Sequence, residues 1–208
     1  MTRAVLIGFG PFPGAPFNPS AALVKALARR RRPAFAELDR ITHVFATVYA
    51  AVDRDLADLL AAKPDIVLIF GLAGRGRHLC IETRARNAVS VLFPDAGGHR
   101  PRHGVIVPGG PPSRAGHAPF ARLLAAVRSS AVPARLSRDA GRYLCNYAYW
   151  RALQHSRHGR PLVVFVHIPG ARANPRPRRR IRHRAPTLAG LLAAAEALLI
   201  ALIAASRR

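Results

Sequence analysis

The sequence has few cysteines, few acidic residues and few lysines. Only two cysteines, Cys80 and Cys145, occur in 208 residues. This excludes the disulfide framework of small secreted domains and indicates a reduced, intracellular setting. Acidic residues number only ten, and Lys25 and Lys63 are the only lysines among 33 basic residues. Nearly all of the positive charge is therefore arginine.

The resulting net charge of +23 suggests a nucleic-acid-binding protein as one hypothesis. However, the arginines are dispersed, and no aromatic-rich RNA platform, zinc-finger spacing or helix-turn-helix pattern accompanies them. The one dense basic cluster is Arg176–Arg184, which we interpret as a solvated loop. We expect at most nonspecific polyanion binding there. An arginine-rich nucleic-acid-associated protein is kept as a hypothesis beside the two that are developed below.

Long apolar runs are also scarce. The run at residues 4–7 stops at a glycine and lacks the cleavage region of a signal peptide. Residues 188–205 are long enough to cross a bilayer at ~1.5 Å per residue, but they are rich in alanine and carry Glu196 near the centre. We therefore expect a helix packed on a sheet, and a soluble, cytoplasmic protein without a membrane segment.

Short β-rich runs alternate with amphipathic helical segments, which predicts an α/β fold. Neither a linker nor an internal repeat divides the chain, so we expect a single domain over residues 1–208. Asn18 followed by Pro19 is a typical helix start. The predicted strands are 3–8, 41–49, 65–70, 79–91, 134–136 and 162–167, and the predicted helices are 19–30, 52–62, 118–128, 145–155 and 188–205.

Cys145 is the first candidate for chemistry. A small-residue turn at residues 139–142 runs directly into a helical segment, which places the sulfur in the first turn of a helix. Unpaired backbone N–H groups and the helix dipole favour the thiolate there, and the thiolate is the form that attacks carbonyls. The alternative is an inert thiol in the core.

His167 and Glu82 are the partners that such a nucleophile would need. His167 ends an apolar strand, and the carboxyl ends of strands are where sites lie in open α/β sheets. A carboxylate beside the imidazole fixes its tautomer and stabilises the imidazolium. The alternatives are a histidine satisfied by local backbone and an ion pair of Glu82 with Arg84 or Arg86. Spacing alone does not establish that the three side chains meet.

Two weaker signals do not predict a cofactor. The glycines at residues 8–14 have the wrong spacing for a dinucleotide-binding loop, and the prolines among them prevent the tight turn such loops need. His99 and His103 are four residues apart, but the intervening proline argues against a helix that would aim both at a metal. We expect neither a metal nor an organic cofactor.

Several segments together carry a resemblance to a known family. The chain resembles pyroglutamyl peptidase I, also called pyrrolidone carboxyl peptidase, along essentially its whole length. The matching segments occur in the family's order: Gly8–Phe12 with Asn18–Ser20, Lys63–Asp65 leading to Gly71–Ala73, Glu82 with Asn87, Val107–Gly109, Ala140–Tyr147 and Phe165–Pro169.

The resemblance implies a cysteine peptidase that removes an N-terminal pyroglutamyl residue from peptides. Cys145 would be the nucleophile, His167 the base and acid, and Glu82 the residue that orients His167. A mixed, mostly parallel sheet between helical layers and a homo-oligomer are implied as well. Asn18 would bind the lactam, and the residues implied to line an apolar pocket are Phe9, Phe12, Phe93, Tyr143 and Leu144.

The chain departs from the family's pattern at two positions. Thr83 and Leu92 stand where the family typically has arginines, the second of them near the active site. An alternative reading is therefore a catalytically weak or specificity-shifted member that acts as a binding or interaction protein.

Overall fold

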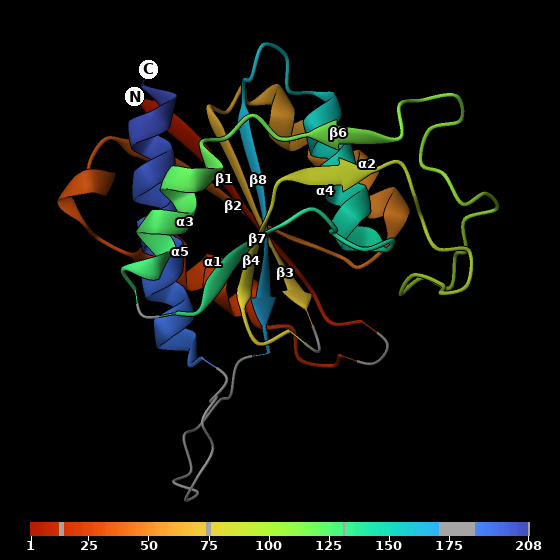
Figure 1. Cartoon of the computed structure of the whole chain (residues 1–208), viewed down its shortest axis with the longest axis horizontal. Coiled ribbons are helices and arrows are strands. Elements are labelled where there is room, and N and C mark those ends of the chain that lie inside the picture. Colours follow the sequence, from red (N-terminus) through yellow and green to blue (C-terminus); the bar gives the residue numbers. More distant parts are fainter. Residues whose placement is uncertain (13–14, 74–75, 131, 171–185, 208) are drawn as a thin grey trace, which may run out of the picture.

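The computed structural model describes residues 1–12, 15–73, 76–130, 132–170 and 186–207. Its centre is a six-stranded sheet with the strand order β2-β1-β3-β8-β4-β7 (Figure 1). The strands are β1 (Thr2–Phe9), β2 (Leu38–Phe45), β3 (Ile66–Ala73), β4 (Leu79–Glu82), β7 (Ala134–Ser137) and β8 (Leu162–Pro169). All neighbours pair in parallel except β4 and β8, which are antiparallel. The predicted mixed, mostly parallel sheet is confirmed.

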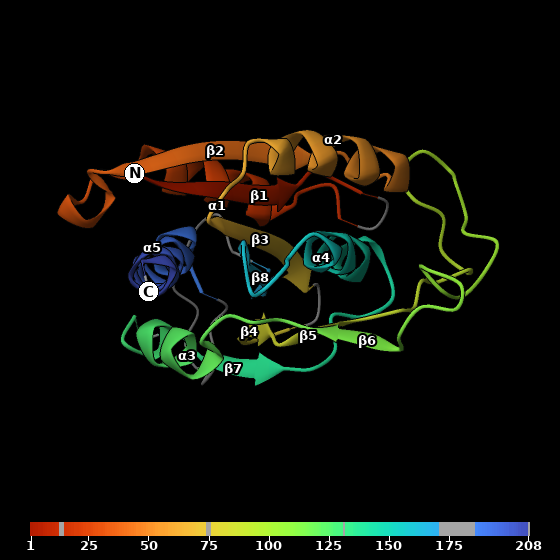
Figure 2. The same cartoon turned by 90° about the horizontal axis from the view of Figure 1, so that it is seen from above.

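The helices form one layer on each face of the sheet (Figure 2). One apolar core lies between the sheet and α1 (Pro19–Arg29), α3 (Phe120–Arg128) and α5 (Leu188–Ser206). The other lies beneath α2 (Tyr49–Ala61) and α4 (Leu144–Gln154). Since both faces are covered, the central strands are continuous apolar runs, and residues 66–70 of β3 are all completely buried. The α/β class inferred from the alternating pattern is therefore correct.

A short ribbon lies outside the main sheet, where β5 (Arg84–Arg86) pairs with β6 (Ser113–Ala115) in antiparallel fashion. The extended stretch predicted at 79–91 is therefore two strands in two different sheets, and β6 lies where neither a strand nor a helix was predicted. A 3₁₀ turn, η1 (Pro33–Phe35), was also not predicted.

The predicted strand 41–49 is wrong at both ends, because β2 ends at Phe45 and Tyr49 already begins α2. The side chain of Val48, the residue before this helix, makes no capping hydrogen bond. Instead, the carboxylate of Asp95 accepts a hydrogen bond from the Tyr49 backbone N–H at 3.0 Å. A cap supplied from 46 residues away leaves no local signal in the sequence.

By length and composition α5 could span a membrane, with a mean hydropathy of 2.3. In the structure it packs on the sheet between α1 and α3, and buried Glu196 forms ion pairs with Arg30 and Arg32. A charge buried in this way is satisfied by its partners. α5 is thus a core helix, as expected, which is consistent with a soluble protein. The basic cluster Arg176–Arg184 lies outside the described residues.

The two ends of the described chain lie at the same end of the molecule, at the amino ends of β1 and β3 (Figure 1). The carboxyl ends of β3 and β8 point the opposite way (Figure 1), and residues there line the cavity described below.

Candidate active site

The structure places Cys145 at the second residue of α4, directly after the turn predicted from the sequence. Gly141 in that turn has a φ of +80°, a backbone conformation that favours glycine. Tyr143 occupies the N-cap position but does not cap the helix, since its hydroxyl donates to the Pro94 carbonyl at 2.8 Å. In the described part of the chain, no side chain accepts from the first N–H groups of α4. These donors are therefore available to a ligand at the sulfur.

His167 and Glu82 meet across the single antiparallel pairing of the sheet. In the register of β4 and β8, Glu82 lies opposite Phe165 and Cys80 opposite His167. His167 Nδ1 and Glu82 Oε1 are 2.9 Å apart, and Glu82 is 1% exposed. This pairing brings together two residues that are 85 positions apart in sequence.

The electrostatics of His167 follow from its two neighbours. Burial by itself lowers the pKa of His167, but hydrogen bonds to Cys145 and Glu82, together with their negative charge, outweigh burial and raise the pKa to about 10. The imidazolium is therefore the favoured form at neutral pH. A cation between a sulfur and a carboxylate is the arrangement of an activated thiol nucleophile.

Gly71 on β3 is required by the close approach of these groups. A Cβ at this position would lie 2.8 Å from Cys145 Sγ and 2.7 Å from the Phe165 ring, distances that real Cβ atoms do not show. In the β3–β8 register Gly71 is also the partner of His167. Sequence reasoning did not place this glycine in the site; the only local signal is its position at the end of a buried strand.

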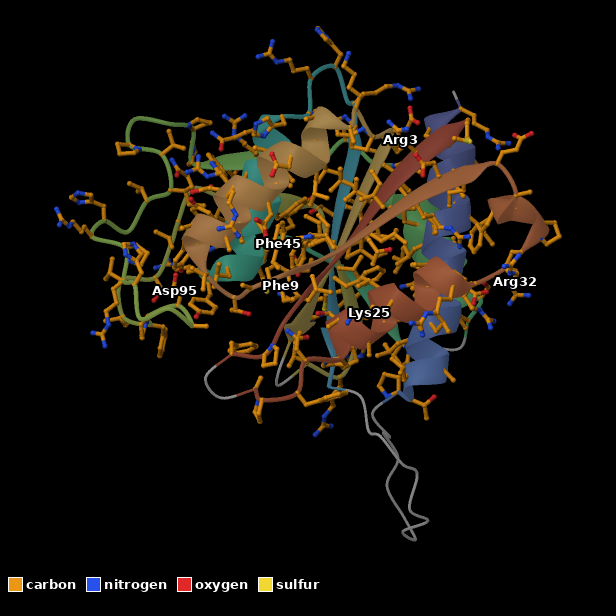
Figure 3. The ribbon with its side chains drawn as sticks, turned by 180° about the vertical axis from the view of Figure 1, so that it is seen from behind. Arg3, Phe9, Lys25, Arg32, Phe45 and Asp95 are labelled. Carbon is orange, nitrogen blue, oxygen red and sulfur yellow. The ribbon has the colours of Figure 1, made fainter. Side chains whose placement is uncertain are left out.

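A cavity of about 170 Å³ opens in front of the sulfur. Of the six residues predicted to bind the substrate, five line this cavity: Phe9, Phe12, Asn18, Tyr143 and Leu144. Phe9 packs against Phe45 with ring centroids 5.7 Å apart, and both point into the core beneath α2 and α4 (Figure 3). The volume is below the ~300–1,000 Å³ of sites for drug-sized ligands, so the cavity suits a small group.

Asn18 is more constrained than the sequence suggested. Its Oδ1 accepts hydrogen bonds from the Ser20 N–H and from the Ser20 hydroxyl, at 3.1 and 2.8 Å. Its Nδ2 donates one hydrogen to the Gly10 carbonyl at 3.1 Å. One amide hydrogen is left to donate to a ligand. Asn18 can therefore serve the cavity as a donor and not as an acceptor.

Phe93 does not line the cavity, contrary to expectation. It is 64% exposed and lies in a neighbouring groove. Phe93 lies on a loop segment that begins with a turn, in which the Ser90 hydroxyl accepts from the Leu92 N–H at 3.2 Å, and that the Tyr143 hydroxyl holds at Pro94.

Other lining residues were missed, because they come from the loop after β2, the end of β3 and the turn before α4: Thr47, Leu72, Ala140, Gly141 and Arg142. The two residues at which the chain departs from the family pattern are not among them. The Thr83 hydroxyl donates to the Ser137 carbonyl at 2.9 Å, and Leu92 is 72% exposed.

Comparison with known proteins shows the family of the chain. A family model described as pyroglutamyl peptidase matches residues 2–207. The chain belongs to the pyroglutamyl peptidase family. Among pyroglutamyl peptidases, the pyrrolidone-carboxylate peptidase of Clavibacter michiganensis is 36% identical over 172 residues, which cover 81% of this chain and 79% of that protein. The pyrrolidone-carboxylate peptidase of Pyrococcus furiosus is 31% identical over 170 residues, covering 80% of each.

Solved structures of pyroglutamyl peptidases share the fold. A mutant pyrrolidone carboxyl peptidase from Pyrococcus furiosus superimposes with a TM-score of 0.85 at 24% identity, covering 99% of this chain and all of that one. The pyrrolidone carboxyl peptidase of Thermus thermophilus gives a TM-score of 0.81 at 30% identity, covering 95% and 98%. The chain is therefore a cysteine peptidase by family and by fold.

Proposed function

We propose that this protein removes N-terminal pyroglutamyl residues from peptides, with Cys145 as nucleophile, His167 as acid and base, and Glu82 as the residue that positions His167. The observation that carries the proposal is that Cys145 and His167 line the same small, mainly apolar cavity while buried Glu82 hydrogen-bonds His167 from behind. The names of the relatives point to the same substrate.

The first half of the reaction forms a thioester. The Cys145 thiolate attacks the carbonyl carbon of the pyroglutamyl residue, and the oxyanion is stabilised by the N–H groups at the start of α4. The His167 imidazolium then donates its proton to the leaving amine as the C–N bond breaks. The shortened peptide leaves with a free amino terminus.

The second half of the reaction regenerates the enzyme. Water attacks the thioester while neutral His167 accepts its proton, and pyroglutamate leaves as the C–S bond breaks. Buried Glu82 keeps Nδ1 of His167 occupied throughout, so that the other ring nitrogen serves the reaction. These steps require neither a metal nor an organic cofactor.

Substrate choice follows from the lining of the cavity. The pyroglutamyl ring is small, flat and uncharged, and it packs against Phe9, Phe12 and Tyr143. The remaining amide hydrogen of Asn18 donates to the lactam carbonyl. An ordinary amino terminus would bring an ammonium group into this cavity, and burying an unpaired charge is costly. The cavity therefore favours a blocked terminus.

The test is turnover of a fluorogenic pyroglutamyl amide by the wild type and by Cys145→Ser. We expect turnover in the wild type and its loss in the variant. The matched control is Cys80→Ser, the other cysteine of the chain, which hydrogen-bonds Arg135 and does not line the cavity. This control should retain turnover. Absence of turnover in the wild type would contradict the proposal.

Thr83 and Leu92 support one alternative, a family member that binds pyroglutamyl peptides without efficient turnover. Calorimetric titration of the wild type with a pyroglutamyl peptide distinguishes the two, because the alternative predicts binding heat without product.

A further inference from the structure

A second hollow of about 470 Å³ adjoins the catalytic cavity. Its walls come from the loop after β5 and from the residues that precede α4. Arg142 and Tyr143 line both the hollow and the cavity, so the two are neighbours that share a wall at the residues before Cys145.

The walls of this groove are apolar and exposed. Val91, Leu92 and Phe93 are 43%, 72% and 64% exposed, and they are three consecutive members of the eight large hydrophobic side chains exposed among the described residues. The chain has 33 basic residues, so a cluster of three exposed apolar side chains contrasts with the charged surface around it. Exposed apolar clusters of this kind mark binding sites.

The exposed segment is held at both ends against the active site. Before it, the Ser90 N–H donates to the Arg142 carbonyl at 2.6 Å. After it, the Pro94 carbonyl accepts from the Tyr143 hydroxyl at 2.8 Å. Asp95, which is 1% exposed, then fixes the loop to the start of α2 (Figure 3). Hydrogen bonds to the residues just before Cys145 therefore hold one wall of the groove in place.

The size of the catalytic cavity determines what must lie in the groove. About 170 Å³ accommodates a small ring only, so the residue after the scissile bond has to lie outside the cavity. The groove is the hollow that shares its walls with the cavity. We propose that the groove binds the side chain of the first residue after the scissile bond and favours a large apolar one. This inference rests on the proposed function.

The test compares kcat/KM for pyroglutamyl-phenylalanine amide and pyroglutamyl-alanine amide, with the products separated by chromatography. We expect the wild type to prefer the phenylalanine substrate by roughly tenfold, the lower end of what an apolar pocket provides. In Val91→Ser and Leu92→Ser the preference should fall to about twofold, because part of the apolar wall is lost.

Val105→Ser is the matched control for Val91→Ser. Both valines are 43% exposed and lie on the same long loop, but only Val91 lines the groove. The control should keep the wild-type preference. As a readout independent of turnover, Cys145→Ser should bind the phenylalanine substrate more tightly than the alanine one in calorimetric titration, and adding Leu92→Ser should remove that difference.

Three outcomes would overturn the inference. The first is a wild type that cleaves both amides equally well, and the second is a preference that survives in both groove variants. The third is a Leu92→Ser variant that becomes monomeric in sedimentation while the preference stays, since the groove would then be an interface between copies of this chain. Failure to cleave either amide would instead overturn the proposed function and this inference together.

Discussion

Cys145 and Glu82 together determine the charge state of His167. The raised pKa of about 10, compared with the ordinary value of 6.5, means that the folded protein holds this proton more tightly than the unfolded chain does. The resulting stabilisation is fully present below pH 6.5 and is lost as the pH rises through about 10. A thiolate–imidazolium enzyme should therefore lose activity on the alkaline side as His167 loses its proton.

Glu82→Gln tests this point, because it removes the charge and keeps the shape. We expect kcat/KM to fall by roughly 100-fold or more, as in other triads that lose this carboxylate. The alkaline limb of the pH–kcat/KM profile should also move to lower pH, since one of the groups that raise the pKa of His167 is gone. A purely structural role for Glu82 would lower the activity without moving that limb.

Gly71→Ala tests how tightly the side chain of Cys145 is packed. Because the added methyl group meets Cys145 Sγ and the Phe165 ring, we expect a loss of about 1–3 kcal/mol in the free energy of unfolding, as for other overpacked cores. The rate of Cys145 alkylation should change as well. In the control, Gly190→Ala on α5, the new Cβ meets only ordinary contacts at 3.6 Å and beyond, so activity should be unchanged. Equal effects of both changes would contradict the close approach.

At the level of elements, the loop from 87 to 112 connects the start of α2 with the groove beside the catalytic cavity. Asp95 accepts hydrogen bonds from the backbone N–H groups of Tyr49, Gly97 and His99, so one carboxylate fixes both the start of α2 and the groove wall. The helix that packs beside α4 is therefore positioned by a residue of the loop.

Asp95→Ala should lower the free energy of unfolding by about 1–3 kcal/mol, since it leaves the buried Tyr49 N–H without a partner and removes two part-buried hydrogen bonds, from Gly97 and His99. Urea unfolding measures this effect. The preference for phenylalanine over alanine after the scissile bond should decrease in the same variant. A stable variant with unchanged preference would show that the loop is held by other contacts.

The elements also show which parts of the structure can be read from sequence. β1, β3 and β8 were predicted because strands covered on both faces are unbroken apolar runs, and α1 because Asn18 and Pro19 mark its start. The start of α2 was not predicted, because the side chain that caps it, Asp95, is distant in the sequence. The antiparallel placement of β4 beside β8 was not predicted either, and this pairing is what brings Glu82 to His167.

The site likewise contains residues that local sequence predicts and residues that it does not. The residue types and the local settings of Cys145 and His167 were visible, because a helix start and a strand end are sequence-local features. The positions of Thr47, Arg142 and Phe93 relative to the cavity depend on how loops from different strands meet. Sequence patterns carry no information on those contacts.

At the scale of the whole molecule, the net charge of +23 predicts attraction to polyanions. We expect oligonucleotide binding that is independent of sequence and that weakens steeply between 50 and 200 mM salt, by roughly 1,000-fold if six or more phosphates are neutralised. Fluorescence anisotropy at several salt concentrations measures this. Binding that distinguishes sequences at constant salt would instead indicate a specific nucleic-acid-binding role. A homo-oligomer is expected as well, and sedimentation velocity tests it.

Both ends of the described chain lie at the amino ends of β1 and β3 (Figure 1), whereas Leu72 and His167, near the carboxyl ends of β3 and β8, line the catalytic cavity. A resin, a sensor chip or a fluorescent fusion partner attached at either end would therefore leave the path of an incoming peptide unobstructed. Immobilised protein should turn over a pyroglutamyl substrate at the same rate per molecule as protein free in solution.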